Sequence, residues 1–255
     1  MTDFPKGAAI VFGATGGIGR VVALEMARAG SDVALIWRSK EDAAKEVAAE
    51  VEALGRKASV HLCDVTVDGE VEAAFAEAGA AHDRVHTLIW GAGPLVDQVY
   101  VAETSEEKWR KAIDVEVHGF FRATKVAIAH MRENGGGSMV HLGSAGDLSW
   151  PEKDVLSVAP KAANESLVKA IAREEGKNNI RANSVLVGVI EAGMFLELSK
   201  QGVFDDAWTA AVQQNLALKR WGQPEEIGHA VVFLTSDKAA YVTGQQIAVA
   251  GGYGL

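Results

Sequence analysis

The chain has 255 residues, and 48% of them are hydrophobic, so it has enough apolar side chains for a buried core and is not a disordered chain. Its 34 acidic residues outnumber its 25 basic ones, and the net charge of −9 disfavours binding to nucleic acids or anionic membranes. Cys63 is the only cysteine, which excludes an internal disulfide bond, and no apolar stretch is long enough to span a bilayer. We therefore expect a soluble, cytoplasmic protein that acts on a small molecule and has no nucleic-acid or membrane partner.

Short apolar runs alternate with helical patterns along the chain. Taken in order, the runs that predict strands are residues 8–12, 33–37, 59–63, 87–90, 138–142, 182–187 and 246–250. The helical patterns between them are clearest over residues 21–29, 42–54, 106–131 and 158–175. This alternation predicts an α/β fold of the Rossmann-like, doubly wound type, with a parallel sheet and helices on both of its faces.

A single domain over residues 1–255 is the expected organisation, because the chain shows no internal repeat, low-complexity tract or linker. The least regular part of the chain begins at Gly188. Long irregular segments in compact domains are commonly functional loops. We therefore expect residues 188–215 to form a substrate loop or lid.

A glycine-rich turn joins the first predicted strand to the first predicted helix, with the sequence Phe12-Gly13-Ala14-Thr15-Gly16-Gly17-Ile18-Gly19. Gly13 permits a tight turn, Gly17 lets the backbone approach a pyrophosphate, and Gly19 lets the helix pack on the strand. The N-terminus of the helix offers free N–H groups to phosphate oxygens. Such a turn can be a simple tight connection, but its place between a strand and a helix favours a dinucleotide site. We expect that site to include Gly13, Thr15, Gly17, Ile18 and Gly19.

The spacing Gly13-x3-Gly17-x-Gly19 resembles that of the short-chain dehydrogenases and reductases. Further matches follow in the family's order, at Cys63-Asp64-Val65-Thr66, Gly91-Ala92-Gly93, Arg220 to Ile227, and Val242 to Gly252. The resemblance covers essentially the whole chain, and it implies a nicotinamide dinucleotide as cofactor. It also implies further cofactor contacts from Asp64, Val65, Gly91, Ala92, Gly93, Lys161, Gly188 and Ile190. Phe12 departs from the family pattern, which usually has Thr there, and Gly91 stands in place of Asn.

The residues after the second predicted strand indicate which dinucleotide is preferred. An acidic side chain there would accept the ribose hydroxyls of NAD(H) and repel a 2′-phosphate. This chain instead has Trp37-Arg38-Ser39-Lys40. Arg38 can pair with a 2′-phosphate and Ser39 can assist it, which favours NADP(H) over NAD(H). The alternative is that these residues form an ordinary solvated, charged loop.

The resemblance implies four catalytic positions, and two of them carry an unexpected residue. Ser144 and Lys161 match the family's serine and lysine. The family's tyrosine lies thirteen residues after that serine and four before that lysine, and both counts lead to Ser157. The helix pattern around residue 116 places Glu116 where the family has Asn. Smaller departures lie nearby, where Val187 replaces Pro and Ala192 replaces Thr.

Losing the tyrosine changes the proton chemistry. A phenol beside an ammonium group is a much stronger acid than a serine hydroxyl, so Ser157 needs help to protonate an alkoxide. Glu116 could supply a proton through a water that links it to Lys161. It could equally be a counter-charge for Lys161 that does no chemistry. The sequence is compatible with both interpretations. The candidate catalytic residues are Ser144, Ser157, Lys161 and Glu116.

Other polar and aromatic residues near these positions have plainer interpretations. We expect His118 to be a structural or surface residue, because it lies two positions after Glu116 and points to another face of the helix. Tyr100 is expected to pack. The acidic residues between Ser144 and Lys161 are expected to lie in a solvated loop, and these are Asp147, Glu152 and Asp154. Trp150 is the best candidate for lining a substrate pocket.

The resemblance leads to a specific functional hypothesis. It predicts an NADP(H)-dependent oxidoreductase that transfers a hydride to or from a small carbonyl, an alcohol or an activated C=C bond, without a metal. The alternative is a non-redox enzyme, or a cofactor-binding regulatory protein, on the same scaffold. The helices over residues 106–131 and 158–175 match the pair that packs across a two-fold axis in this family. A homodimer or homotetramer is therefore expected.

Overall fold

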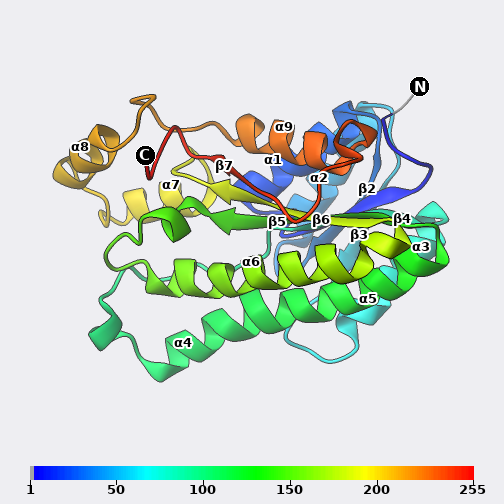
Figure 1. Ribbon diagram of the computed structural model, residues 1–255, viewed down its shortest axis with the longest axis horizontal. Coiled ribbons are helices and arrows are strands. Elements are labelled where there is room, and N and C mark those ends of the chain that lie inside the picture. Colours follow the sequence, from blue (N-terminus) through cyan, green and yellow to red (C-terminus); the bar gives the residue numbers. More distant parts are fainter. Residues whose placement is uncertain (1–2) are drawn as a thin grey trace.

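The computed structural model of the protein describes residues 3–255, and these residues form a parallel β-sheet with helices on both faces (Figure 1). The strands are β1 (Ala8–Phe12), β2 (Asp32–Trp37), β3 (Ala58–Leu62), β4 (Val85–Trp90), β5 (Gly137–Ser144), β6 (Ile180–Val187) and β7 (Gln246–Val249). Their order in the sheet is β3-β2-β1-β4-β5-β6-β7, and each strand pairs in parallel with its neighbours. The predicted strands and the Rossmann-like, doubly wound topology are confirmed.

The helices form two layers that enclose the sheet. They are α1 (Gly17–Arg28), α2 (Glu41–Ala53), α3 (Glu70–His82), α4 (Glu106–Ile113), α5 (Gly119–Glu133), α6 (Val155–Glu175), α7 (Gly193–Lys200), α8 (Asp206–Gln214) and α9 (Pro224–Thr235). One core cluster joins α1, α2 and α9 to the sheet, and the other joins α3, α5 and α6 to its opposite face. No helix within residues 3–255 is long and apolar enough to cross a membrane.

The central strands are buried on both faces, which explains their near-continuous apolar sequences. Every residue of β1 and β4 is buried. Successive side chains of a strand point to opposite faces, so Ile10 and Phe12 belong to one core cluster while Ala9 and Val11 belong to the other. The chain order reverses between β1 and β4, and this reversal opens a crevice at the carboxyl ends of the strands, where ligands bind in open α/β sheets.

Two segments differ from the sequence-based expectation. The helix expected over residues 106–131 is interrupted by a π-helical turn at Asp114–His118, in which the Gly119 N–H bonds to the Asp114 carbonyl. A π turn takes up one extra residue, so a regular helical pattern does not reveal it. The segment 188–215 is also more regular than its sequence indicates, because it contains α7 and α8.

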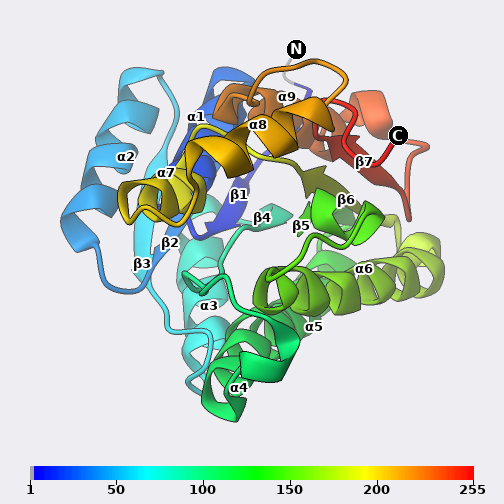
Figure 2. The same ribbon diagram turned by 90° about the vertical axis from the view of Figure 1, so that its left-hand side faces the viewer.

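An aromatic cluster joins these two short helices. The rings of Phe204 and Trp208 stack with their centroids 4.0 Å apart, and the ring centroids of Phe195 and Trp221 are 5.3 Å apart. Aromatic pairs at such separations add stability beyond the area they bury. The cluster therefore explains how a segment with weak helical periodicity becomes ordered. Figure 2 shows α7 and α8 in front of the strand ends.

Candidate active site

Several of the candidate site residues follow the carboxyl ends of the strands, as their order in the sequence predicts. The glycine turn follows β1, Arg38 follows β2, Asp64 lies just after β3, and Gly91 follows β4. Ser144 ends β5, and Gly188 lies directly after β6. Because the carboxyl ends of parallel strands meet at one edge, the fold brings these residues to one side of the sheet.

The glycine turn has the geometry of an anion site. Gly13 has a φ of +80°, which favours glycine, and the Gly16 N–H donates to its carbonyl over 2.9 Å. Helix α1 begins at Gly17, and no side chain caps its N-terminus. The first N–H groups of α1 are therefore available to a phosphate. A side chain at Gly17 would collide with the backbone of Gly193, so the start of α7 lies close to this turn.

Arg38 and Asp64 lie close together at the ends of β2 and β3. An Arg38 guanidinium nitrogen is 3.8 Å from a carboxylate oxygen of Asp64, and the Arg38 side chain is 58% exposed. The other Asp64 oxygen accepts hydrogen bonds from the backbone N–H and the hydroxyl of Thr66, at 2.9 and 2.6 Å. Partial burial raises the pKa of Asp64, but these bonds and Arg38 outweigh it, so the net shift is downward and Asp64 is ionised.

Backbone hydrogen bonds tie two other candidate cofactor residues to neighbouring segments at the ends of the strands. The Gly91 N–H bonds to the Phe12 carbonyl, and the Gly188 N–H bonds to the Val249 carbonyl, each over 3.1 Å. The Ile190 side chain is buried in the core on the α1 and α9 side of the sheet. Ser39 is exposed, whereas Thr15, Ile18 and Ala92 are half-buried and Val65 is buried.

Ser144, Ser157 and Lys161 are held by β5 and α6. The Ser144 hydroxyl accepts a hydrogen bond from the Gly146 N–H over 3.1 Å, which leaves its own proton free to be donated. Ser157 is half-buried and lies four residues before Lys161 on α6, so the two side chains share a helix face.

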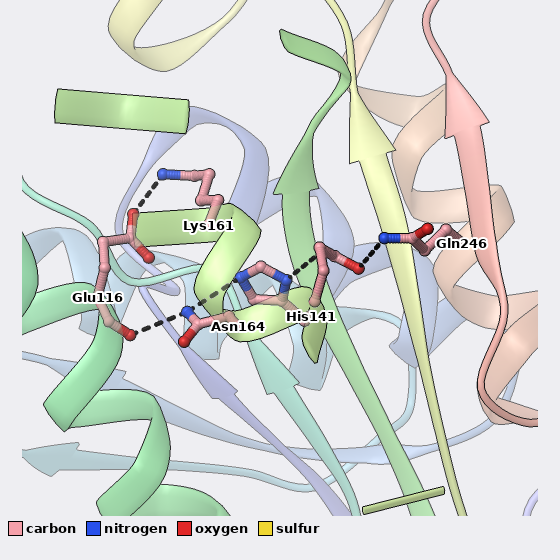
Figure 3. Close-up of polar contacts among 6 residues, drawn as sticks. Glu116, His141, Lys161, Asn164 and Gln246 are labelled. Atoms are coloured by element: carbon pink, nitrogen blue, oxygen red, sulfur yellow. Dashed lines mark hydrogen bonds and ion pairs between the residues drawn. The ribbon is translucent and has the colours of Figure 1, made fainter. Parts of the chain in front are cut away.

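Glu116 forms an ion pair with Lys161, as Figure 3 shows. The Glu116 side chain is 3% exposed and that of Lys161 is 17% exposed. The carboxylate also lies against Gly93, where a Cβ atom would collide with it. Of the two roles considered for Glu116, this contact directly supports that of a counter-charge to Lys161.

The same residue is connected to a buried polar network. The backbone carbonyl of Glu116 accepts a hydrogen bond from the Asn164 amide over 3.0 Å, and that amide lies 3.3 Å from Nε2 of His141. Nδ1 of His141 lies 2.7 Å from Glu165, whose second oxygen accepts from the Gln246 side chain over 2.9 Å. Burial raises the pKa of Glu165. Its hydrogen bonds, first of all that with His141, outweigh burial, so the net shift of the pKa is downward and Glu165 is a carboxylate.

Known proteins are similar to this chain over nearly its whole length. A family model described as enoyl-(acyl carrier protein) reductase matches residues 13–254. The chain belongs to the short-chain dehydrogenase/reductase family. This confirms the resemblance seen in its motifs and makes it a member of a family of NAD(P)-dependent oxidoreductases.

Individual members of the short-chain dehydrogenase/reductase family agree in length as well as in fold. The uncharacterised oxidoreductase YgfF of Escherichia coli is 34% identical over 96% of this chain and 98% of its own length. A 3-oxoacyl-(acyl-carrier-protein) reductase of Staphylococcus epidermidis is 32% identical, over 96% of this chain and 97% of its own. A short-chain type dehydrogenase/reductase of Mycobacterium ulcerans superimposes with a TM-score of 0.91 at 28% identity, covering 98% of this chain and 90% of that one.

Some acidic and aromatic residues of this protein lie differently from expectation. Asp154 is not in a solvated loop: it is half-buried at the start of α6 and accepts a hydrogen bond from Gln98 over 2.9 Å. Burial raises the pKa of Asp154, although Gln98 and Lys161 oppose the rise. Trp150, the expected pocket residue, is 57% exposed. His118 is exposed and bonds to Asp114 over 3.0 Å, as expected for a surface residue.

Two loops join at the rim of the site, and the sequence gives no sign of this contact. The Val99 N–H bonds to the Lys153 carbonyl over 3.0 Å, next to the bond between Gln98 and Asp154. Tyr100, which was expected to pack, is 46% exposed, and its ring lies 4.9 Å from the Lys153 ammonium group. A separate cavity of about 440 Å³ is lined in part by Ser149, Lys219 and Tyr253.

Proposed function

We propose that this protein is an NADP(H)-dependent oxidoreductase that transfers a hydride to or from a small carbonyl, an alcohol or an activated C=C substrate. The observation that carries this proposal is the combination of an uncapped α1 N-terminus, Ser144 at the end of β5, and Lys161. Lys161 is paired with Glu116, whose carboxylate lies against Gly93 after β4. Related proteins support it by their names, which include 3-oxoacyl-(acyl-carrier-protein) reductase and L-rhamnose 1-dehydrogenase (NAD(P)(+)).

The residues present fit a dinucleotide. The free N–H groups at the start of α1 would hold the pyrophosphate, with Thr15 and Ile18 beside it. Asp64 and Val65 would contact the adenine, while Gly91, Ala92 and Gly93 would border the nicotinamide ribose together with Lys161. The backbone of Gly188 and Ile190 would border the nicotinamide. Arg38 and Ser39 would hold the 2′-phosphate of NADP(H), because no carboxylate follows β2 directly and Arg38 is exposed.

Hydride donation by bound NADPH is the chemistry that the cofactor supplies in this proposal. As negative charge develops on the substrate oxygen, the hydroxyls of Ser144 and Ser157 donate hydrogen bonds to it. Ser157 passes its proton to that oxygen and takes one from the Lys161 ammonium group. The ion pair with the Glu116 carboxylate holds Lys161 in place, and this lysine recovers its proton from solvent after the reaction.

The test combines binding with turnover. NADPH and NADH are titrated separately, and NADPH oxidation is then followed at neutral pH with a panel of ketones, 3-oxoacyl thioesters and enones. We expect tighter NADPH binding and oxidation with at least one substrate, and we expect Ser144→Ala and Lys161→Met to abolish that oxidation. Binding of neither dinucleotide would overturn the proposal.

A second candidate function is a regulatory protein that binds the cofactor without turnover. The observation that favours it is the engagement of Lys161 by Glu116 together with serine at position 157. Tight NADPH binding with no oxidation of any panel substrate would support this candidate against the first.

We also propose an assembly, a location and a role for the segment 188–215. The protein forms a homodimer or homotetramer in the cytoplasm, with α5 and α6 at the two-fold interface. Phe121 on α5 is 50% exposed in the single chain, so its side chain is open to contact with a partner chain. The segment 188–215, with α7 and α8, closes over the bound substrate as a lid.

A further inference from the structure

The position of Glu116 depends on its backbone as well as on its side chain. Glu116 lies in the π-helical turn Asp114–His118, where the regular helical bonding pattern is interrupted. Its carbonyl oxygen accepts a hydrogen bond from Asn164 on α6, the helix that also carries Lys161. The turn that presents the carboxylate is therefore attached to the helix that presents the ammonium group.

The backbone carbonyl also determines the orientation of the Asn164 amide. A carbonyl oxygen can only accept, so the amide nitrogen must face Glu116, over 3.0 Å. The same nitrogen faces Nε2 of His141 at 3.3 Å, so Nε2 has to be an acceptor. The proton of a neutral His141 ring is then on Nδ1, which donates to the Glu165 carboxylate over 2.7 Å.

This arrangement is buried and can exist in one hydrogen-bonding pattern only. His141 and Asn164 are 0% exposed and Glu165 is 3% exposed. The buried Asn164 amide oxygen has no hydrogen-bond partner among residues 3–255, and turning the amide over would place that oxygen against the Glu116 carbonyl. The pattern shown in Figure 3 is thus the one that keeps both of the amide's N–H groups bonded.

We infer that Asn164, oriented by the His141–Glu165 pair, is a positioning residue that fixes the π-helical turn and so holds the Glu116 carboxylate on Lys161. Its effect on turnover rests on the proposed function, whereas its effect on Lys161 does not. The side-chain hydrogen bonds of Asn164 within residues 3–255 go to the Glu116 carbonyl and to His141, so Asn164 acts through the backbone of Glu116.

The first experiment measures how fast Lys161 reacts with a water-soluble amine reagent, using peptide mass spectrometry on the full chain. Asn164→Asp keeps the side-chain volume but removes both donated N–H groups. We expect the labelling of Lys161 to become about fivefold faster, the factor that corresponds to the loss of one ordinary hydrogen bond. The labelling of Lys169, which is exposed on the same helix, should not change. Asn164→Leu serves the same purpose if the Asp variant does not fold.

Matched variants separate positioning from general loosening of α6. Val168→Ala weakens the packing of the same helix without touching the network, because Val168 is 2% exposed and belongs to the apolar core. Its Lys161 labelling should equal that of the wild type. His141→Gln keeps an acceptor toward Asn164 and a donor toward Glu165, so it should stay within about twofold of the wild type, whereas His141→Leu should match Asn164→Asp. Equal labelling in Val168→Ala and Asn164→Asp would overturn the inference.

The second experiment is kinetic and uses a substrate that the wild type turns over. Asn164→Asp should lower kcat about tenfold, while the dissociation constant of NADPH, set mainly by the glycine turn and Arg38, changes less than about twofold. An unchanged kcat together with unchanged Lys161 labelling would refute the positioning role. A wild type without any turnover would refute the proposed function instead, and the labelling result would still decide the inference.

Discussion

The ion pair between Glu116 and Lys161 predicts an order of stabilities for variants of its two residues. Two unit charges about 4 Å apart attract by roughly 4 kcal/mol at an effective dielectric constant of 20. Removing one partner of a buried pair costs about 3–5 kcal/mol, since the other charge is left without compensation. The two partners differ in burial, because the Glu116 side chain is 3% exposed and that of Lys161 is 17% exposed.

Lys161→Met should therefore be the more damaging change. It leaves the Glu116 carboxylate buried and unpaired, and we expect a loss of roughly 3 kcal/mol in the free energy of unfolding. Glu116→Gln should cost only about 1–2 kcal/mol, since the long stem of Lys161 lets its ammonium group move toward water. The double variant should be more stable than Lys161→Met alone, because neither charge remains.

Urea unfolding followed by circular dichroism at pH 8 measures these differences. In a chain of this size, a loss of about 3 kcal/mol also lowers Tm by roughly 6–12 °C. Lys169→Met, an exposed change on the same helix, should stay within about 0.5 kcal/mol of the wild type. A double variant less stable than Lys161→Met, or a Lys161→Met cost below about 1 kcal/mol, would show that the two charges are not paired in solution.

Four further predictions test the cofactor, the proton donor, the assembly and the acid stability. Arg38→Asp should reverse the preference for NADPH over NADH in calorimetric titrations, because a carboxylate repels a 2′-phosphate and accepts hydrogen bonds from ribose hydroxyls. Equal affinities of the wild type for NADPH and NADH would refute the assignment of NADP(H) as cofactor. Ser157→Tyr, especially together with Glu116→Asn, should gain ketone reduction with NADPH in steady-state assays, because Lys161 one turn away can activate a phenol. A folded, NADPH-binding variant without such a gain would count against this alignment of position 157. Phe121→Glu should reduce the mass measured by light scattering toward the 26.9 kDa of one chain, and a monomeric wild type would exclude the α5 interface. Burial, and to a lesser extent the charge of Arg84, lower the pKa of His86 from 6.5 to about 4. The stability that depends on a neutral His86 ring is therefore complete above pH 6.5, and roughly 3 kcal/mol of the free energy of unfolding is lost as the pH falls toward 4. Urea unfolding at pH 4.5 and 7 should show a smaller difference for His86→Gln than for the wild type, and equal differences would contradict this role.

The amino-acid sequence alone was enough to predict the sheet and the identity of most candidate site residues. Buried parallel strands have continuous apolar sequences, and β1 and β4 are such strands. The glycines of the turn after β1 predict that turn, since Gly13 has a backbone conformation that other residues rarely adopt. The positions of Ser144, Ser157 and Lys161 follow from the resemblance to the family, whose spacing can be counted along the chain. All of these signals involve residues that are close in the sequence.

The contacts of the site were decided by the tertiary structure. Glu116 and Lys161 are 45 residues apart, and only the packing of the π-helical turn against α6 brings their charges together. The sequence pattern predicted a solvated Asp154 and indicated no role for His141, Asn164 or Glu165. The one available signal was the presence of polar residues at apolar positions of β5 and α6. Local periodicity predicts which residues form a helix or strand. It carries no information about which polar groups meet when two elements pack, because that depends on the relative placement of the whole elements.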